Sequence, residues 1–424
     1  MIKRSFFSLG KPGLKHQSIG EASGVKEVSL PAQVRLLVKG CDIGAIRLKV
    51  GSAVLTGQKV VLTDDADGYV LSTVTGTVSG ISEYRGYMNE SYAAIAIDVS
   101  GEDQVDDATV SALEEADFEA ARNYLRSLPG KSDFSSFLKL DPPVNTVVVT
   151  CMDEDLLVST RQQAVLSDVE GLVEGIGYLK QVGRIGRVVT AAPSALVPVL
   201  LEAGIEVMEV CDRYPNSLSG MIAKDVLGGD YMPSKSFEEQ GIGFISAEAV
   251  IGLSRIFGKG EIPVEKLITV IGKGGESQMV RARIGTSVSD ILSSVGIGAA
   301  TGDCVIFGGP MTGTSVYTLD MQVLADTDAV MVQDSSEVVL SQDGQCINCG
   351  ECVRVCPVKV PVNMLVRVLA SGLYEEASEM YDLHCCIECG LCTYVCVARI
   401  PIFHHIMLGK HEFARIKNAE ESNG

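Results

Sequence analysis

The hydrophobic positions divide the chain into segments with different periods. From about Leu36 to Val99, short β-branched runs separated by glycine turns predict strands. From Asn145 to Leu253, buried-strand runs such as NTVVVTC and RVVTAAP alternate with helical patterns. One of these, VEGLVEGIGYLKQVG, predicts an amphipathic helix that begins near Val169. Such alternation indicates an α/β layer built on a parallel sheet.

The pattern from Glu265 onwards predicts further strands and helices. The stretch from Glu265, EKLITVIGKGGESQMVRARIGTSVSDILSSVGI, predicts a pair of strands and then a short helix, and AVMVQD predicts another strand. The stretch PVKVPVNMLVRVLASGLYEEASEMYDLH predicts a helix from near Pro361 and a second helix that ends before Cys385. A last helix is predicted after His404 and His405, which we expect to be surface or packing residues.

The cysteines near the end of the chain are spaced in a repeating pattern. Eight of the thirteen form two runs of C-x₂-C-x₂-C-x₃-C, which read CINCGECVRVCP and CIECGLCTYVCV. This is the bacterial ferredoxin signature, in which three thiolates of one run bind a [4Fe-4S] cluster and the fourth binds the other cluster. The rule predicts two ligand sets. They are Cys346, Cys349, Cys352 with Cys396, and Cys386, Cys389, Cys392 with Cys356.

Zinc and disulfides are the alternatives for these cysteines. A zinc site takes four ligands in two pairs and leaves the third and fourth cysteines of each run unexplained, while disulfides suit a small secreted domain. Cys385, beside Cys386, is an alternative ligand, a thiol near the cluster or an idle neighbour. The remaining cysteines have apolar neighbours and are predicted to be core residues. They are Cys41, Cys151, Cys211 and Cys304.

Composition narrows the class of protein. A chain of 424 residues can bury a large core and form roughly two to four domains. Its formal charge of −19 disfavours nucleic acid and anionic lipid as partners. The sequence shows no apolar run long enough to span a membrane and no signal-peptide pattern. We therefore expect a cytoplasmic protein, which a complex could hold at the inner face of the cell membrane.

The order of these parts resembles that of the RnfC family, which belongs to the Rnf ion-translocating ferredoxin:NAD oxidoreductase. The resemblance is carried by CIECGLCTYVC with RIP after it, by the barrel motif RLKVGSAVLTGQKV and by VEGLVEGIGYLK. It implies a multidomain α/β protein with four parts. These are a carrier-like barrel-sandwich (1–115), an α/β domain similar to the flavoprotein subunit of complex I (116–258), an SLBB ubiquitin-like module (259–333) and an α-helical two-cluster ferredoxin domain (334–424).

The flavin site of that family is only partly matched. A glycine-rich loop near a lysine binds FMN in the family, and the matching stretch here is LPGKSDFSSFLKL, in which Lys131, Ser132 and Asp133 replace small residues. The flavin-contacting positions read Ser246 and Ala249. The resemblance thus implies a degenerate FMN and NADH site and makes bound FMN doubtful. Its matching residues are Gly130, Phe134 and Lys139, with Asp153 and Asp155 left from the acidic nucleotide loop.

Three hypotheses about function follow. The first is an electron-transfer protein that has two [4Fe-4S] clusters, has lost nucleotide chemistry and docks on a redox partner. That partner would be a membrane Rnf-like assembly, a soluble reductase or a flavoprotein. The second is an FMN-dependent NADH dehydrogenase of the Rnf type, or an electron donor of the cobalamin or proline reductase type. The third is an assembly scaffold whose clusters are structural.

Overall fold

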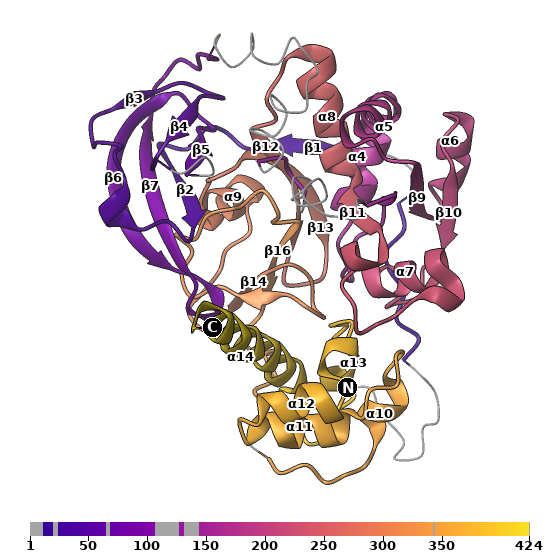
Figure 1. Ribbon diagram of the computed structural model, residues 1–424. Helices are drawn as coiled ribbons and strands as arrows, with labels where there is room; N and C mark the ends of the chain where they lie inside the picture. Colours follow the sequence, from indigo (N-terminus) through magenta and orange to yellow (C-terminus); the bar gives the residue numbers. More distant parts are fainter. Residues whose placement is uncertain are drawn as a thin grey trace. The chain divides into compact units, whose positions relative to one another are not determined.

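The computed structural model describes residues 12–19, 24–64, 68–106, 127–130, 144–341 and 344–423 (Figure 1). The chain forms two compact units. The larger unit comprises Gln17–Asp212 and Phe237–Val338. The smaller unit, here called the cysteine unit, comprises Met1–His16, Arg213–Ser236 and Val339–Gly424. Both cysteine motifs therefore lie in the cysteine unit, which also includes Arg213–Ser236 from within the predicted α/β domain. The division into four domains stays a prediction.

The strands predicted before residue 100 are confirmed. They form a four-stranded antiparallel sheet in the order β2-β7-β6-β3 and a separate pair, β4 with β5. Alternating residues such as Val34, Leu36, Ile95 and Ile97 point into a shared apolar core. The elements are β2 (Gln33–Lys39), β3 (Ala53–Val54), β4 (Lys59–Val61), β5 (Tyr69–Leu71), β6 (Gly76–Arg85) and β7 (Ser91–Val99), with short 3-10 turns η1 (Ile43–Ala45) and η2 (Tyr87–Asn89).

The predicted parallel sheet is also confirmed. Its order is β10-β9-β8-β11, and every neighbouring pair is parallel. The strands are β8 (Thr146–Thr150), β9 (Arg187–Pro193), β10 (Val207–Val210) and β11 (Ile242–Ser246). The helices are α4 (Thr160–Ser167), α5 (Val169–Gly183), α6 (Val197–Glu202) and α8 (Ala247–Lys259), with the 3-10 turn η4 (Glu238–Gln240). The helix predicted from Val169 is α5, whose first turn is capped by the Asp168 carboxylate, which accepts from Gly171 N–H.

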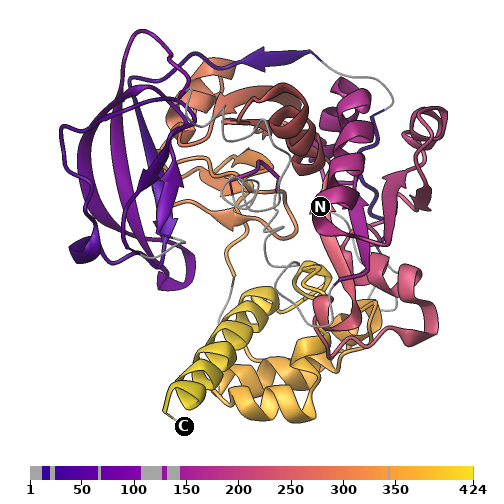
Figure 2. The same cartoon turned by 45° about the horizontal axis from the view of Figure 1, so that its top comes forward.

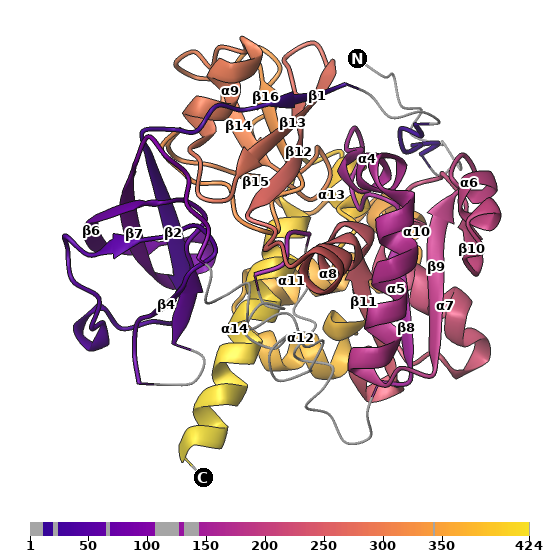
Figure 3. The same ribbon diagram turned by 90° about the horizontal axis from the view of Figure 1, so that it is seen from above.

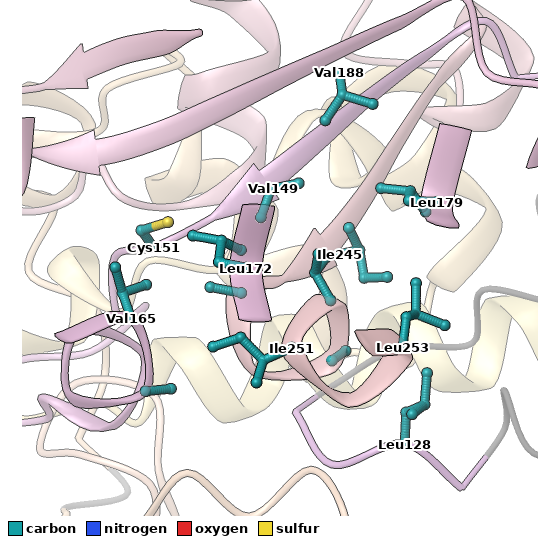
Figure 4. Close-up of a cluster of buried hydrophobic side chains, with 14 of the residues drawn as sticks. Leu128, Val149, Cys151, Val165, Leu172, Leu179, Val188, Ile245, Ile251 and Leu253 are labelled. Carbon is teal, nitrogen blue, oxygen red and sulfur yellow. The ribbon is translucent and has the colours of Figure 1, made fainter. Parts of the chain in front are cut away.

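Helices α5 and α8 lie side by side and cover the sheet (Figure 3). A side chain at Gly175 of α5 would collide with the Val250 carbonyl of α8, so only glycine permits this approach. Figure 4 shows the core that results, in which Val149 of β8, Leu172 of α5 and Ile251 of α8 belong to one buried cluster. Close packing therefore holds α5 and α8 together over the sheet.

A second, mixed sheet follows, in the order β1-β13-β12-β16-β14-β15. The predicted strand pair and short helix are β12, β13 and α9, and AVMVQD supplies β16, so these predictions are confirmed. The elements are β1 (Val25–Glu27), β12 (Glu265–Ile271), β13 (Ser277–Arg283), α9 (Val288–Val295), β14 (Cys304–Phe307), β15 (Thr314–Ser315) and β16 (Ala329–Gln333). The assignment of this region to the SLBB type stays a prediction.

The described part of the cysteine unit is helical. The two helices predicted between the motifs are α11 (Val362–Ala370) and α12 (Tyr374–Met380), and both pack against the last helix, α14 (Ile402–Asn423), as Figure 2 shows. The other elements are α7 (Ser219–Leu227), η3 (Gly228–Asp230), α10 (Glu351–Val355), η5 (Leu383–Cys385) and α13 (Leu391–Tyr394). No helix within the described ranges is long and apolar enough to cross a membrane.

One helix boundary was predicted wrongly. His404 and His405 lie in the first turn of α14 instead of before it. The helix can begin at Ile402 because Thr393 Oγ1, in the second cysteine motif, accepts a hydrogen bond from Phe403 N–H at 2.7 Å. This satisfies an N–H group that a local capping residue would otherwise bind. The signal for this boundary is a contact between separate elements, which the local pattern does not contain.

Candidate iron–sulfur site

The first motif contributes three cysteines to one cavity. Cys346 and Cys349 are half-buried in the loop before α10, and Cys352 is buried within α10. Cys396 from the second motif lines the same cavity. The remaining lining is largely apolar and includes Ile347, Val366, Ile400 and Ile402. The structure thus brings together the four cysteines that the crossing rule predicts for the first cluster.

The second predicted set is also brought together. Burial is the main reason that the pKa of the Cys389 thiol rises to about 12, and the charges of the nearby Cys386 and Cys356 thiolates add to it. Burial likewise raises the pKa of Cys392, with Cys386 and Cys389 as further causes and Cys352 as a weaker one. Cys356 therefore lies near the thiols of the second motif. The influence of Cys352 on Cys392 indicates that the two sets are neighbours.

The chemistry of these two sets fits an iron–sulfur cluster. Burial is the largest cause that raises the pKa of Cys352 to about 11, followed by the charge of Cys349, so closely spaced thiolates in an apolar cavity need positive charge beside them. Bound iron supplies such charge, and thiolate is the ligand type of these clusters. All thirteen cysteines lie in the described part of the chain, and each is a free thiol. Within the same residues, no three His, Cys, Asp or Glu side chains converge on a site for a single metal ion.

The two motif loops repeat one backbone conformation. Gly350 and Gly390, at the start of α10 and α13, both have positive φ, 75° and 66°. Two residues earlier, Asn348 and Glu388 have φ of 57° and 58°, which is uncommon for a residue with a side chain. The repetition indicates that the cysteine spacing and its glycine impose the loop shape. The sequence signals the glycines, but it gives no sign that Asn348 and Glu388 share this conformation.

The cysteines outside the two sets differ in their surroundings. Cys385, in η5, is half-buried and packs at the edge of the apolar core of the cysteine unit. Cys151 is buried, as predicted for a core residue, whereas Cys41 and Cys304 are half-buried. Cys211 is exposed, so its prediction as a core residue was wrong. It directly follows β10, where the chain leaves the sheet.

The residues predicted for a degenerate nucleotide site bond to the protein itself. Gly130, with φ of 91°, donates its N–H to the Ala325 carbonyl at 2.6 Å and accepts a hydrogen bond from Ser246 Oγ. Ser246 in turn caps α8 by accepting from Ala249 N–H at 3.1 Å. Phe134 and Lys139 lie outside the described residues, as do Lys131, Ser132 and Asp133. The Gly130 carbonyl therefore meets the Ser246 hydroxyl, and the Gly130 N–H meets Ala325.

The two acidic residues of the predicted nucleotide loop also have internal partners. Asp153 accepts from Arg161 N–H at 2.9 Å and from Gln162 Nε2 at 3.2 Å, and burial raises its pKa to about 6. Asp155 accepts from the N–H and Oγ1 of Thr312, both at 2.7 Å, and from Met311 N–H. The first carboxylate holds the start of α4, and the second holds the loop after β14.

A buried cluster of charges that the sequence analysis missed lies beside these residues. Arg161 and Lys266 are 2% and 0% exposed, and both approach Asp328, at 3.3 Å and 3.0 Å. Lys266 also binds Glu248, and Arg161 binds Glu154 and, at 3.2 Å, Thr150 Oγ1. Thr150 ends β8 and Glu248 lies in the first turn of α8, after β11. Parallel sheets usually bind ligands at this edge.

Comparison with known proteins shows sequence similarity to subunits of oxidoreductase complexes. The chain is 24% identical to the RnfC subunit of the proton-translocating ferredoxin:NAD(+) oxidoreductase complex of Clostridium ljungdahlii, over 60% of this chain and 58% of that protein. It is 22% identical to the RnfC subunit of the Na(+)-translocating complex of Acetobacterium woodii, over 75% and 76% of the two chains. The chain is a divergent RnfC-like protein. No protein-family model matches it.

The RnfC-like chain matches only part of several relatives. It is 25% identical to the RnfC subunit of an ion-translocating oxidoreductase complex of Klebsiella pneumoniae, over 82% of this chain but 49% of that protein. The chain spans about half the length of this relative and 58% of the Clostridium one. Among solved structures, the RnfC-like chain is similar to an NAD+-reducing [NiFe]-hydrogenase in the H2-reduced state. That match has 14% identity, a TM-score of 0.45 and coverage of 70% and 64% of the two chains.

Proposed function

We propose that this RnfC-like chain transfers electrons through two [4Fe-4S] clusters, to or from a redox protein. The observation that carries the proposal is the double cysteine motif, whose fourth cysteine in the second run lines the cavity of the first. Cys346, Cys349, Cys352 and Cys396 would hold one cluster, and Cys356, Cys386, Cys389 and Cys392 the other. Each cluster would accept and release one electron. The chain would bind the clusters, keep water from the buried thiols and hold the two sites close together.

We also propose that the α/β domain binds neither FMN nor NADH. FMN and NADH bind through phosphate groups, which need backbone N–H groups or cations that are free to meet them. Here Arg161 and Lys266 are already paired with carboxylates, and the acidic side chains around them outnumber these two cations. Gly130 donates its N–H to a carbonyl. A phosphate at this edge of the sheet would therefore meet surplus negative charge.

A partner protein is part of the proposal, because a chain that only carries electrons must receive them from one redox centre and pass them to another. The curated relatives are named as subunits of ion-translocating oxidoreductase complexes. We propose a complex with such a membrane assembly, or with a soluble reductase or flavoprotein. A net charge of −19 favours a partner with a basic face, and the association should weaken as salt rises.

The direct test is anaerobic purification of the full chain followed by iron, sulfide and flavin analysis. The proposal expects about eight iron and eight sulfide per chain, and absorbance that dithionite bleaches. It also expects no flavin after acid extraction and no bleaching by NADH. Bound flavin with rapid reduction by NADH would instead support the FMN-dependent dehydrogenase. Zinc without sulfide would overturn both functions, and clusters that dithionite cannot reduce would indicate a structural scaffold.

A further inference from the structure

The second cysteine motif is contacted by a segment that is far away in the sequence. Tyr214 donates a hydrogen bond from its hydroxyl to the backbone carbonyl of Cys389 at 2.6 Å. Both residues belong to the cysteine unit, and they are 2% and 8% exposed. A buried carbonyl without a donor is costly, so this bond holds the motif loop at one of its ligand positions.

Tyr214 is itself held in place by residues outside both motifs. Its N–H donates to the Leu14 carbonyl at 3.0 Å, and its ring lies 5.4 Å from the ring of His16. The Nε2 atom of His16 is hydrogen-bonded to Ser217 Oγ at 2.9 Å. These contacts fix the backbone and the ring of Tyr214. The direction of its hydroxyl therefore does not depend on the cysteine loop that it meets.

A second contact comes from helix α7, which follows Tyr214. A methyl group added to Gly220, in the first turn of α7, would lie 2.6 Å from Ile387 Cγ2, so the helix touches the loop between Cys386 and Cys389. The Tyr231 hydroxyl lies beside the same position, 3.5 Å from the added methyl group. The segment Arg213–Ser236 thus packs along one side of the second motif.

The matching carbonyl of the first motif has a different donor. Cys349 O accepts from Arg354 Nη2 at 2.8 Å, and Arg354 is an exposed side chain of α10, five residues further along the same motif. The two loops share their backbone conformation. The loops therefore differ in the donor to this carbonyl. In the first motif the donor is a solvent-exposed cation, and in the second it is a buried neutral hydroxyl.

We propose that Tyr214 is a positioning residue for the second iron–sulfur cluster. It fixes the loop from Cys386 to Cys389 and raises the reduction potential of that cluster relative to the first. This rests on the proposed function. A carbonyl oxygen near a cluster disfavours the added electron, and a hydroxyl that donates to this oxygen offsets its partial negative charge. Arg354 serves the first motif in the same way, but water screens its charge.

The test is Tyr214→Phe in the full chain, because phenylalanine keeps the ring that packs against His16. In a redox titration followed by electron paramagnetic resonance, one of the two potentials should fall. At a fixed ambient potential the reduced-to-oxidised ratio of that cluster should drop about threefold, the effect expected from one hydrogen bond. Arg354→Gln should lower the other potential instead. The matched control is Tyr381→Phe, since the Tyr381 hydroxyl makes no hydrogen bond with the described residues.

A second readout does not require bound clusters. Hydrogen–deuterium exchange of the protein as isolated should speed up in Tyr214→Phe between Ile387 and Leu391, and stay unchanged between Ile347 and Glu351. If iron analysis finds no cluster, the proposed function fails while this readout still tests the positioning role. If Tyr214→Phe does not fold, Ser217→Ala loosens His16 and should give a smaller change of the same sign. Equal shifts in both potentials, or no shift together with unchanged exchange, would overturn the proposal.

Discussion

In the cysteine unit, thiols from two separate motifs face a cavity lined by apolar side chains, whereas in the larger unit Arg161 and Lys266 meet carboxylates of the chain itself. Both regions gather chemistry-bearing residues from distant parts of the sequence. They differ in where the polar groups find their partners. Thiols around an apolar cavity are suited to an added metal group, whereas paired charges leave little for a ligand to bind. Function in this protein is thus better inferred from the type of groups that converge on a cavity than from the number of charged residues.

The largest expected effect concerns the cysteines that are proposed to bind the clusters. Cys389→Ala should remove one cluster, so iron and sulfide should fall from about eight to about four per chain. The cysteine unit should also lose thermal stability, because cluster binding contributes to its folding free energy. Cys211→Ala is the control, since Cys211 is exposed and outside both motifs. An unchanged iron content in Cys389→Ala would contradict the ligand assignment.

The second effect breaks the charged cluster. Lys266→Met should lower the free energy of unfolding by about 3–5 kcal/mol, because it leaves Glu248 and Asp328 buried without this cation. Urea denaturation followed by circular dichroism measures it. Arg187→Met removes an exposed pair with Glu206 and should cost at most about 1 kcal/mol. Equal losses of unfolding free energy in the two variants would mean that burial does not make the Lys266 ion pairs more important for stability than the exposed Arg187 pair.

The third effect concerns pH. The pKa of Asp153 is raised to about 6 in the folded protein from an ordinary value of 3.8, so the native state holds this proton more tightly than the unfolded chain. Its contribution to stability is therefore full below about pH 4, decreases as pH rises through 6, and amounts to about 3 kcal/mol in all. Asp153→Asn should flatten the stability profile between pH 4 and 6. Profiles of equal slope in variant and parent would show that Asp153 does not titrate in this range.

The smallest expected effect concerns the Thr393 hydroxyl of the second motif, which accepts a hydrogen bond from the start of α14. Thr393→Val should destabilise the start of α14 by about 1 kcal/mol, because Phe403 N–H loses its acceptor. The corresponding residue of the first motif is already a valine, Val353, so the change makes the two motifs alike at this position. Faster amide exchange at Phe403 is the expected observation. The control is Thr314→Val, a threonine of the short strand β15 in the larger unit.

Much of the fold could be predicted because its signals are local. The period of VEGLVEGIGYLKQVG predicted the helix from Val169, and the β-branched runs predicted β8 and β9. The cysteine spacing predicted which thiols meet, since the loop shape is imposed by a few adjacent residues. The alternatives of zinc and disulfides were weighed on the same local pattern. The pairing of the two motifs, such as Cys396 with Cys346, does join distant segments, and the known ferredoxin ligand rule supplied it.

Most of the missed features depend on long-range contacts. Lys266 lies near the start of a largely apolar strand, and nothing near it in the sequence shows that Glu248 and Asp328 will bind it. The hydrogen bond from Tyr214 to Cys389 joins residues 175 positions apart. Cys211 was predicted to be a core residue, but it follows the last residue of β10, is itself followed by Asp212 and Arg213, and is exposed. Local hydrophobicity does not determine which partner a polar group meets.

The cysteine unit is assembled from three separate stretches of the chain, and this affects how it can be made. Tyr214 is synthesised 175 residues before Cys389, so the hydrogen bond between them cannot form until the second motif has been made. Pairings of such high contact order form late and slowly. Insertion of the second cluster should therefore follow synthesis of both motifs. A fragment that begins at Val339 would contain every ligand cysteine but lack Tyr214 and α7, and its second loop should accordingly be the less ordered of the two.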